Sequence, residues 1–235
     1  MRDARLDYAR EPSGTGALLI MNAASIAGWG LVGLLIGGGL RMFVERVVAL
    51  PALTKRVAPP AVLEVVTALL FAALAWRSGA KAELFAYSWL AAISVPLAAI
   101  DWRTRQLPTR LIWPGGLVLI AIFGMAAAVN RDTYPLIRSF AGMLALLAFY
   151  GAIYFLRPGE LGGGDLRLGG LLGLALGWIG WIAVLTGTLL GWLAAAIAVI
   201  ALRAVRRTGT GRRDVPLGPF LVIGTFVTVL AIPPV

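Results

Sequence analysis

The sequence predicts an all-α, polytopic membrane protein with about eight transmembrane helices. Of its 235 residues, 60% are hydrophobic and only 14% are charged, and the mean hydropathy is +0.87. Soluble domains are about 45–50% apolar and about 25% charged. Apolar runs recur from residue 17 to the end and leave no room for a sizeable soluble domain. We therefore expect a polar N-terminal tail over residues 1–16 and a single transmembrane domain over residues 17–235.

Each predicted element is an apolar run, because a helix needs about 20 such residues to cross the hydrocarbon core. The segments are 17–40, 61–76, 83–100, 111–129, 136–156, 166–177, 181–203 and 217–233. The first exceeds the apolar region of about 7–15 residues of a secretory signal, so we expect it to stay as a helix. The sixth is short, and Gly177-Trp178-Ile179-Gly180 predicts a turn after it. One long kinked helix through 166–203 is the alternative.

The basic residues predict the orientation of these helices. With eight crossings, loops 41–60, 101–110, 157–167 and 203–213 share one side and carry 14 of the 21 Lys and Arg residues. The positive-inside rule places these loops in the cytoplasm and both termini outside. A net charge of +10 that is spread over such loops fits membrane lipids with anionic headgroups, and we expect no nucleic-acid partner.

The composition also limits the possible chemistry. The chain has no cysteine and no histidine. This excludes disulfides, a cysteine nucleophile, a Ser-His-Asp triad and the usual zinc sites, and we expect no metal and no cofactor. Among the remaining side chains, Asp and Glu are the ones that readily act as general acid and base.

Two acidic residues border apolar segments on the same predicted side. Asp101 ends the third segment, and Asp165 follows three glycines and opens the sixth. A carboxylate at bilayer depth costs about 2.5–3.5 kcal/mol on insertion scales, which makes such residues functional candidates. If the fold brings the two together, they can share a proton and activate water, as in an aspartic protease.

Each acid also has a structural interpretation. Asp165 is a suitable helix N-cap, and glycines precede many helices. Asp101 can pair with Arg105 four residues later. Glu64, near the start of the second segment, is interpreted as a first-turn acid that complements the helix dipole.

Four local motifs, taken in order, resemble those of the type IV prepilin peptidases, which are membrane aspartic proteases of the G-x-G-D type. Glycines at such a motif allow sharp turns and a close approach of backbone to substrate. The matches are Ile100-Asp101 with Leu107-Pro108-Thr109-Arg110-Leu111, Leu161-Gly162-Gly163-Gly164-Asp165-Leu166-Arg167-Leu168, the stretch from Pro60 to Leu70 with Glu64, and Val215-Pro216-Leu217-Gly218-Pro219-Phe220.

The resemblance implies an aspartic endopeptidase that removes the basic leader of prepilins or pilin-like proteins at the cytoplasmic face of a bacterial or archaeal membrane. It implies Asp101 and Asp165 as the catalytic pair. The implied substrate-binding or site-shaping residues are Gly162, Gly163, Gly164, Pro108, Arg167 and Glu64. Many family members carry a cytoplasmic domain with two C-x-x-C pairs and methylate the new N-terminus. Because this chain has no cysteine, we expect a compact form without that domain and without the methyltransferase activity.

Two other classes of function stay open at this point. A proton-coupled transporter also uses intramembrane carboxylates, but it predicts acids deep within helices and toward both faces of the membrane. A non-enzymatic membrane scaffold would use both Asp residues only as helix caps. An Asn replacement separates these classes, because Asn still caps a helix but cannot act as an ionised base.

Overall fold

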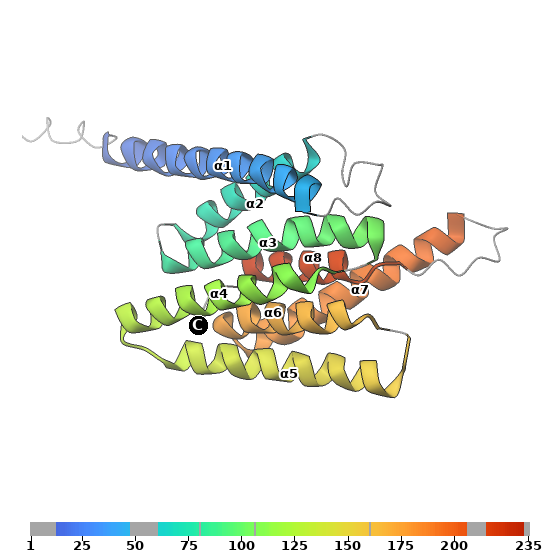
Figure 1. Ribbon diagram of the computed structural model, residues 1–235. Helices are drawn as coiled ribbons and strands as arrows, with labels where there is room; N and C mark the ends of the chain where they lie inside the picture. Colours follow the sequence, from blue (N-terminus) through green and yellow to red (C-terminus); the bar gives the residue numbers. More distant parts are fainter. Residues whose placement is uncertain are drawn as a thin grey trace, which may run out of the picture.

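The computed structural model describes residues 13–47, 61–79, 81–105, 107–159, 161–205 and 215–232. These residues form helices and contain no strand, which confirms the all-α prediction. Figure 1 shows the helices in chain order. They are α1 (Ser13–Val47), α2 (Val62–Ser78), α3 (Ala82–Thr104), α4 (Thr109–Asn130), α5 (Tyr134–Leu156), α6 (Gly163–Ile179), α7 (Trp181–Val205) and α8 (Gly218–Ala231).

Each predicted segment corresponds to one of these helices. Residues 1–12 of the predicted tail and 48–60 of the first predicted cytoplasmic loop lie outside the described residues. Within the described part, α1, α3, α4, α5 and α7 contain stretches that are long and apolar enough to cross a membrane. The chain is therefore a multi-pass membrane protein, whereas eight crossings and outward termini remain predictions.

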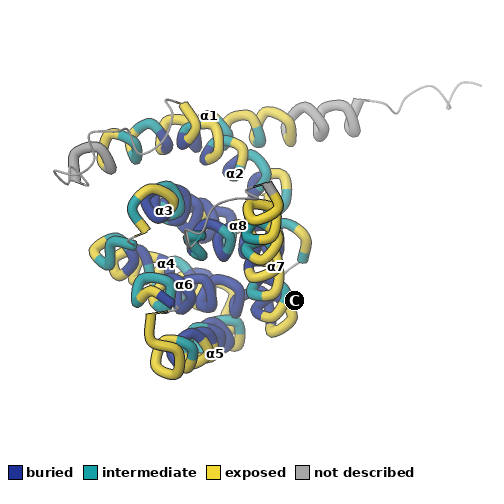
Figure 2. The backbone as a smooth tube through the Cα atoms, turned by 90° about the vertical axis from the view of Figure 1, so that its right-hand side faces the viewer, coloured by how far each residue is buried: buried dark blue, intermediate teal, exposed yellow. Residues whose placement is uncertain are grey.

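Three helices, α3, α6 and α8, form the buried centre of the bundle, and the others surround them (Figure 2). Every residue of α6 from Leu168 to Ile179 is buried. The outer helices turn large apolar side chains outward, for example Leu117 on α4 and Leu185 on α7, as expected of surfaces that face lipid.

Glycine lets the central helices approach their neighbours closely. A methyl group at Gly173 on α6 would lie 2.5 Å from the carbonyl oxygen of Gly142 on α5, so no larger residue fits without movement. In a membrane, where lipid is as apolar as leucine, small residues at helix contacts replace hydrophobic burial as the source of tight packing.

A buried arginine explains why residues 166–203 form two helices. Helix α6 ends at Ile179, and α7 begins at Trp181. The break predicted within residues 177–180 is therefore present, but only Gly180 lies outside the two helices. Arg138 on α5 donates from Nε to the carbonyl of Gly177 at 2.8 Å and from Nη2 to those of Trp178 and Ile179 at 2.5 and 2.9 Å. These carbonyls have no partner within α6 once the helix stops, so the guanidinium caps it.

Candidate active site

Asp101 lies in the last turn of α3 and is almost fully buried, with 4% of its surface exposed. Its Oδ2 accepts a hydrogen bond of 3.2 Å from the backbone N–H of Gly218, the first residue of α8. The ion pair with Arg105 does not form between these two described residues. Arg105 is the left-handed C-cap of α3, with φ 54°, and therefore leaves the helix face that Asp101 occupies.

Asp165 lies in the first turn of α6 but is not its N-cap. Gly162 occupies that position, and a methyl group there would lie 3.2 Å from Oδ2 of Asp165, so the carboxylate lies back against the N-cap residue. This is the reach from the third helical residue back to the N-cap that capping boxes use. The other oxygen, Oδ1, is buried without a hydrogen-bond partner in the described part of the chain. The carboxylate thus supports the helix start and keeps one oxygen free.

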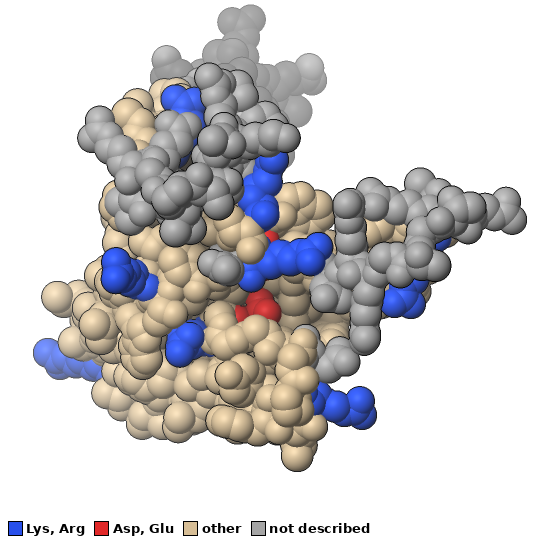
Figure 3. Space-filling view, turned by 45° about the vertical axis from the view of Figure 1, so that its right-hand side comes forward, with Lys and Arg blue, Asp and Glu red and all other residues tan. Residues whose placement is uncertain are grey.

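The fold brings these two carboxyl groups together. They are close enough for their charges to interact. Leu107, in the turn between α3 and α4, contacts both helix starts: a methyl group at Gly164 would lie 2.6 Å from its Cβ, and one at Gly218 would lie 3.5 Å from its Cδ1. Figure 3 shows acidic atoms at the middle of one face, with basic side chains around them. The prediction that Asp101 and Asp165 share one side of the bundle agrees with this arrangement.

The three glycines before Asp165 leave room for neighbouring side chains. None of them has a positive φ, so a sharp left-handed turn is not their role. Gly164 packs against Leu107 as described above. A methyl group at Gly162 would lie 3.2 Å from Oδ2 of Asp165, and one at Gly163 would lie 3.8 Å from Nη1 of Arg167. The glycines therefore let the Asp165 turn pack closely against neighbouring side chains.

Pro108 and Arg167 belong to the same end of the bundle. Pro108 is the N-cap of α4. Arg167 is exposed, and its Nη1 donates to Oγ1 of Thr109 at 3.2 Å and to the carbonyl of Gly163 at 3.3 Å. Arg167 thereby links the turn that carries Pro108 to the turn that carries Asp165.

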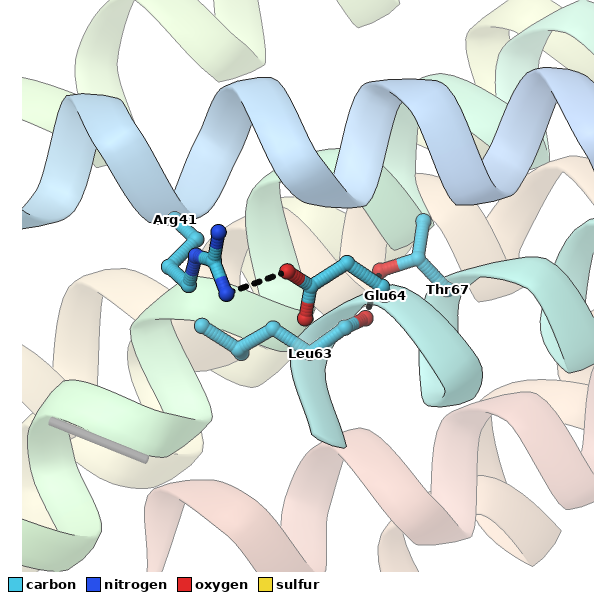
Figure 4. A network of polar contacts seen from close by, with 4 residues as sticks. All are labelled: Arg41, Leu63, Glu64 and Thr67. Carbon is cyan, nitrogen blue, oxygen red and sulfur yellow. Dashed lines mark hydrogen bonds and ion pairs between the residues drawn. The ribbon is translucent and has the colours of Figure 1, made fainter. Parts of the chain in front are cut away.

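Glu64 belongs to a different contact. It lies in the first turn of α2, and its Oε1 forms an ion pair of 3.0 Å with Nη1 of Arg41 on α1 (Figure 4). The two helices are very close here, since a methyl group at Gly37 would lie 2.7 Å from the Cα of Glu64. Next to this pair, Thr67 donates to the carbonyl of Leu63 at 2.7 Å. The contacts of Glu64 indicate that it joins α1 to α2.

Sequence reasoning missed two residues of this arrangement. Gly218 was part of a recognised motif but had no role, and its N–H is the hydrogen-bond donor to Asp101. Leu107 was also within a motif, and it contacts Gly164 and Gly218. The available signal was that the motif around Gly218 starts the last apolar segment on the same predicted side as Asp101 and Asp165.

Comparisons with a family model and with curated proteins point to the same family. The model of the type IV leader peptidase family matches residues 84–233, a range that includes Asp101, Asp165 and Gly218 but not Glu64. A prepilin leader peptidase/N-methyltransferase of Pseudomonas putida is 30% identical over 172 residues, which are 72% of this chain and 57% of that protein. One of Bacillus subtilis (strain 168) is 30% identical over 172 residues, 71% of this chain and 64% of that protein.

The chain thus spans less than two thirds of the length of either relative. No solved structure matches it. The family model alone covers well over half of the chain, and the matched range contains Asp101, Asp165 and Gly218. The chain therefore belongs to the type IV leader peptidase family.

Proposed function

We propose that this chain is a membrane aspartic endopeptidase that removes the basic leader of prepilins or pilin-like proteins, with Asp101 and Asp165 as its catalytic pair. The observation that carries the proposal is that these two carboxyl groups lie at one end of the bundle within range of each other's charge, with Asp101 held by the N–H of Gly218 at the start of α8. The family membership and the names of the two relatives support the substrate class.

The chemistry requires one ionised and one protonated carboxyl group, and two interacting carboxyl groups favour this state because like charges resist ionising at once. The ionised group takes a proton from a water molecule, whose oxygen attacks the peptide carbonyl carbon. The protonated group donates its proton to the carbonyl oxygen. The tetrahedral intermediate then breaks its C–N bond: the amine takes the proton that the first carboxyl group received from water, and one hydroxyl of the intermediate returns a proton to the second carboxyl group, which leaves a new carboxylic acid and restores both aspartates.

The site would lie at the cytoplasmic face of a bacterial or archaeal cytoplasmic membrane, where a basic leader remains after the apolar part of a substrate has inserted. The predicted orientation supports this side. Exposed Arg103, Arg105, Arg110 and Arg167 lie in the segments that border the two acids. The methyltransferase activity in the relatives' names is not part of the proposal.

The test is cleavage of a co-expressed prepilin by wild type, Asp101→Asn and Asp165→Asn, read as a gel shift. We expect wild type to cut and both variants to lose at least about 10²-fold in rate, because removing a catalytic proton acceptor or donor costs about 10²–10⁴-fold. Asp132→Asn is the matched control, because Asp132 is exposed and its Oδ1 only accepts the Tyr134 N–H at 3.0 Å. Cutting by both variants at the wild-type rate would refute the catalytic pair and favour a scaffold.

A further inference from the structure

An apolar groove lies between α2, α3 and α8. Its volume is about 310 Å³, within the range of about 300–1,000 Å³ that is usual for ligand pockets. All of its lining residues are apolar; they include Val66 on α2, Ala98 and Ala99 on α3, and Ile223 and Phe226 on α8. A groove without a polar group to orient a polar ligand fits an apolar occupant.

One end of the groove lies next to the candidate active site. Ala98 and Ala99 precede Asp101 on α3 by less than one helical turn. On α8 the lining begins at Pro219, the residue after Gly218, whose N–H is bound to Asp101. The end of the groove at the start of α8 therefore adjoins the Asp101 carboxylate.

From that end the groove runs away from the candidate site along α8. Its lining extends from Pro219 to Phe226, a distance of about 10 Å at the rise of an α-helix. This corresponds to about two turns of a helix lying alongside. Trp102, four residues after Ala98 on the same face of α3, is 57% exposed. The centroids of its ring and the Phe220 ring lie 6.2 Å apart. An aromatic side chain at this end is typical of a membrane–water boundary.

We propose that this groove receives the first two turns of the apolar helix that follows the scissile bond of the substrate. The inference rests on the proposed function and adds the place where the membrane part of the substrate binds. A helix in the groove would enter at the end next to Asp101 and run toward the bilayer centre. The residues just before it would then lie beside the two carboxyl groups.

The small residues of α3 favour a helix over a lipid chain in this groove. Within a bilayer the hydrophobic effect does not drive helix association, and close packing against small side chains does. Ala98 and Ala99 are only partly exposed and offer such a surface next to the bulkier Val66 and Ile223. An acyl chain is the alternative occupant, and it makes a different prediction for cross-linking.

The absence of cysteine makes a cross-linking test direct. A single cysteine replaces Ile223 in the groove or, as the control, Leu144 on α5, which is 61% exposed outside the groove. Both variants also carry Asp165→Asn, so that the substrate stays uncut. The probe is a prepilin with one cysteine placed in turn at each of the first eight positions of its apolar helix.

We expect disulfide formation with Ile223→Cys at substrate positions that recur every three or four residues, and none with Leu144→Cys. Equal cross-linking at both positions, or none at Ile223→Cys, would overturn the inference and leave the groove to lipid. Because cross-linking needs no cleavage, its failure is separate from that of the proposed function. A chain that cross-links through the groove but cuts no prepilin refutes only the proposed function.

A kinetic test uses Ala99→Leu, which adds bulk inside the groove, and Ala121→Leu on the exposed face of α4 as the control. We expect Ala99→Leu to raise KM at least tenfold for full-length prepilin. The rise in KM for a short peptide that ends soon after the scissile bond should be several-fold smaller than that for full-length prepilin. An equal effect on the two substrates, or no effect on either, would contradict a groove that holds the apolar helix.

Discussion

Replacing Gly218 by alanine perturbs Asp101 without removing any group that takes part in the proposed chemistry. A methyl group at this position would lie 2.6 Å from Oδ2 and 3.3 Å from Cγ of Asp101. An ordinary van der Waals contact begins at about 3.4 Å, so the carboxylate must retreat by about 0.8 Å. The φ angle of Gly218 is not positive, so alanine introduces no left-handed backbone strain.

We expect this retreat to lower kcat/KM by about 10²-fold, the loss that a misplacement of about 1 Å produces at a site that depends on orientation. The assay is the initial rate of prepilin cleavage by the purified protein at several substrate concentrations. Gly124→Ala on α4 is the matched control, because no atom lies within 4 Å of an added methyl group there. Thermal unfolding checks that both variants are folded.

A Gly218→Ala variant that is folded and cuts prepilin within about twofold of wild type would refute this reasoning. That result would mean either that the Gly218 contact does not hold Asp101 in place or that Asp101 does not act in cleavage. The Asp101→Asn variant separates the two cases, since it keeps the side-chain volume and removes only the ionised oxygen. Loss of cleavage in Asp101→Asn alone would leave the catalytic role and reject the positioning role of Gly218.

Further predictions concern residues outside the carboxyl pair. Arg138→Met should lower the free energy of unfolding by about 3 kcal/mol, because it leaves buried carbonyls at the end of α6 without a donor; unchanged thermal unfolding would contradict the capping role. Glu64→Gln and Arg41→Gln should each lower the free energy of unfolding by about 1 kcal/mol and leave the cleavage rate within about twofold of wild type. A large loss of activity in Glu64→Gln alone would place Glu64 in the site. Arg167→Ala should reduce cleavage moderately and Arg167→Lys less, because lysine keeps one donor for Thr109 or Gly163; equal rates for both variants would contradict this linking role.

The positions of the helices were predictable because each helix depends on the apolar character of its own stretch of sequence. Apolar runs marked their positions, and the glycines around 177–180 marked the end of α6. The meeting of Asp101 and Asp165 was also within reach, since alternating crossings and basic loops placed both acids on one side. Such inferences need only local composition and the count of segments.

The contacts of individual side chains were not predictable in the same way. Arg138 lies near the start of the predicted segment 136–156, and nothing in the local sequence indicates that it caps a helix end 39 residues away. Glu64 pairs with Arg41 because α1 and α2 cross at Gly37, and this crossing depends on how two helices pack. A sequence shows which residues are charged, but tertiary packing decides which partner each one reaches.

The position of Leu107 means that one side chain sets the width of the gap between two helix starts. It packs against Gly164, next to Asp165, and lies near Gly218, whose N–H is bound to Asp101. It therefore acts as a spacer between the helix starts that adjoin the two proposed catalytic residues. A shorter residue such as valine would let the starts of α6 and α8 draw together, and a longer one would part them. The separation of the two carboxyl groups is thus adjustable from a position that itself takes no part in proton transfer.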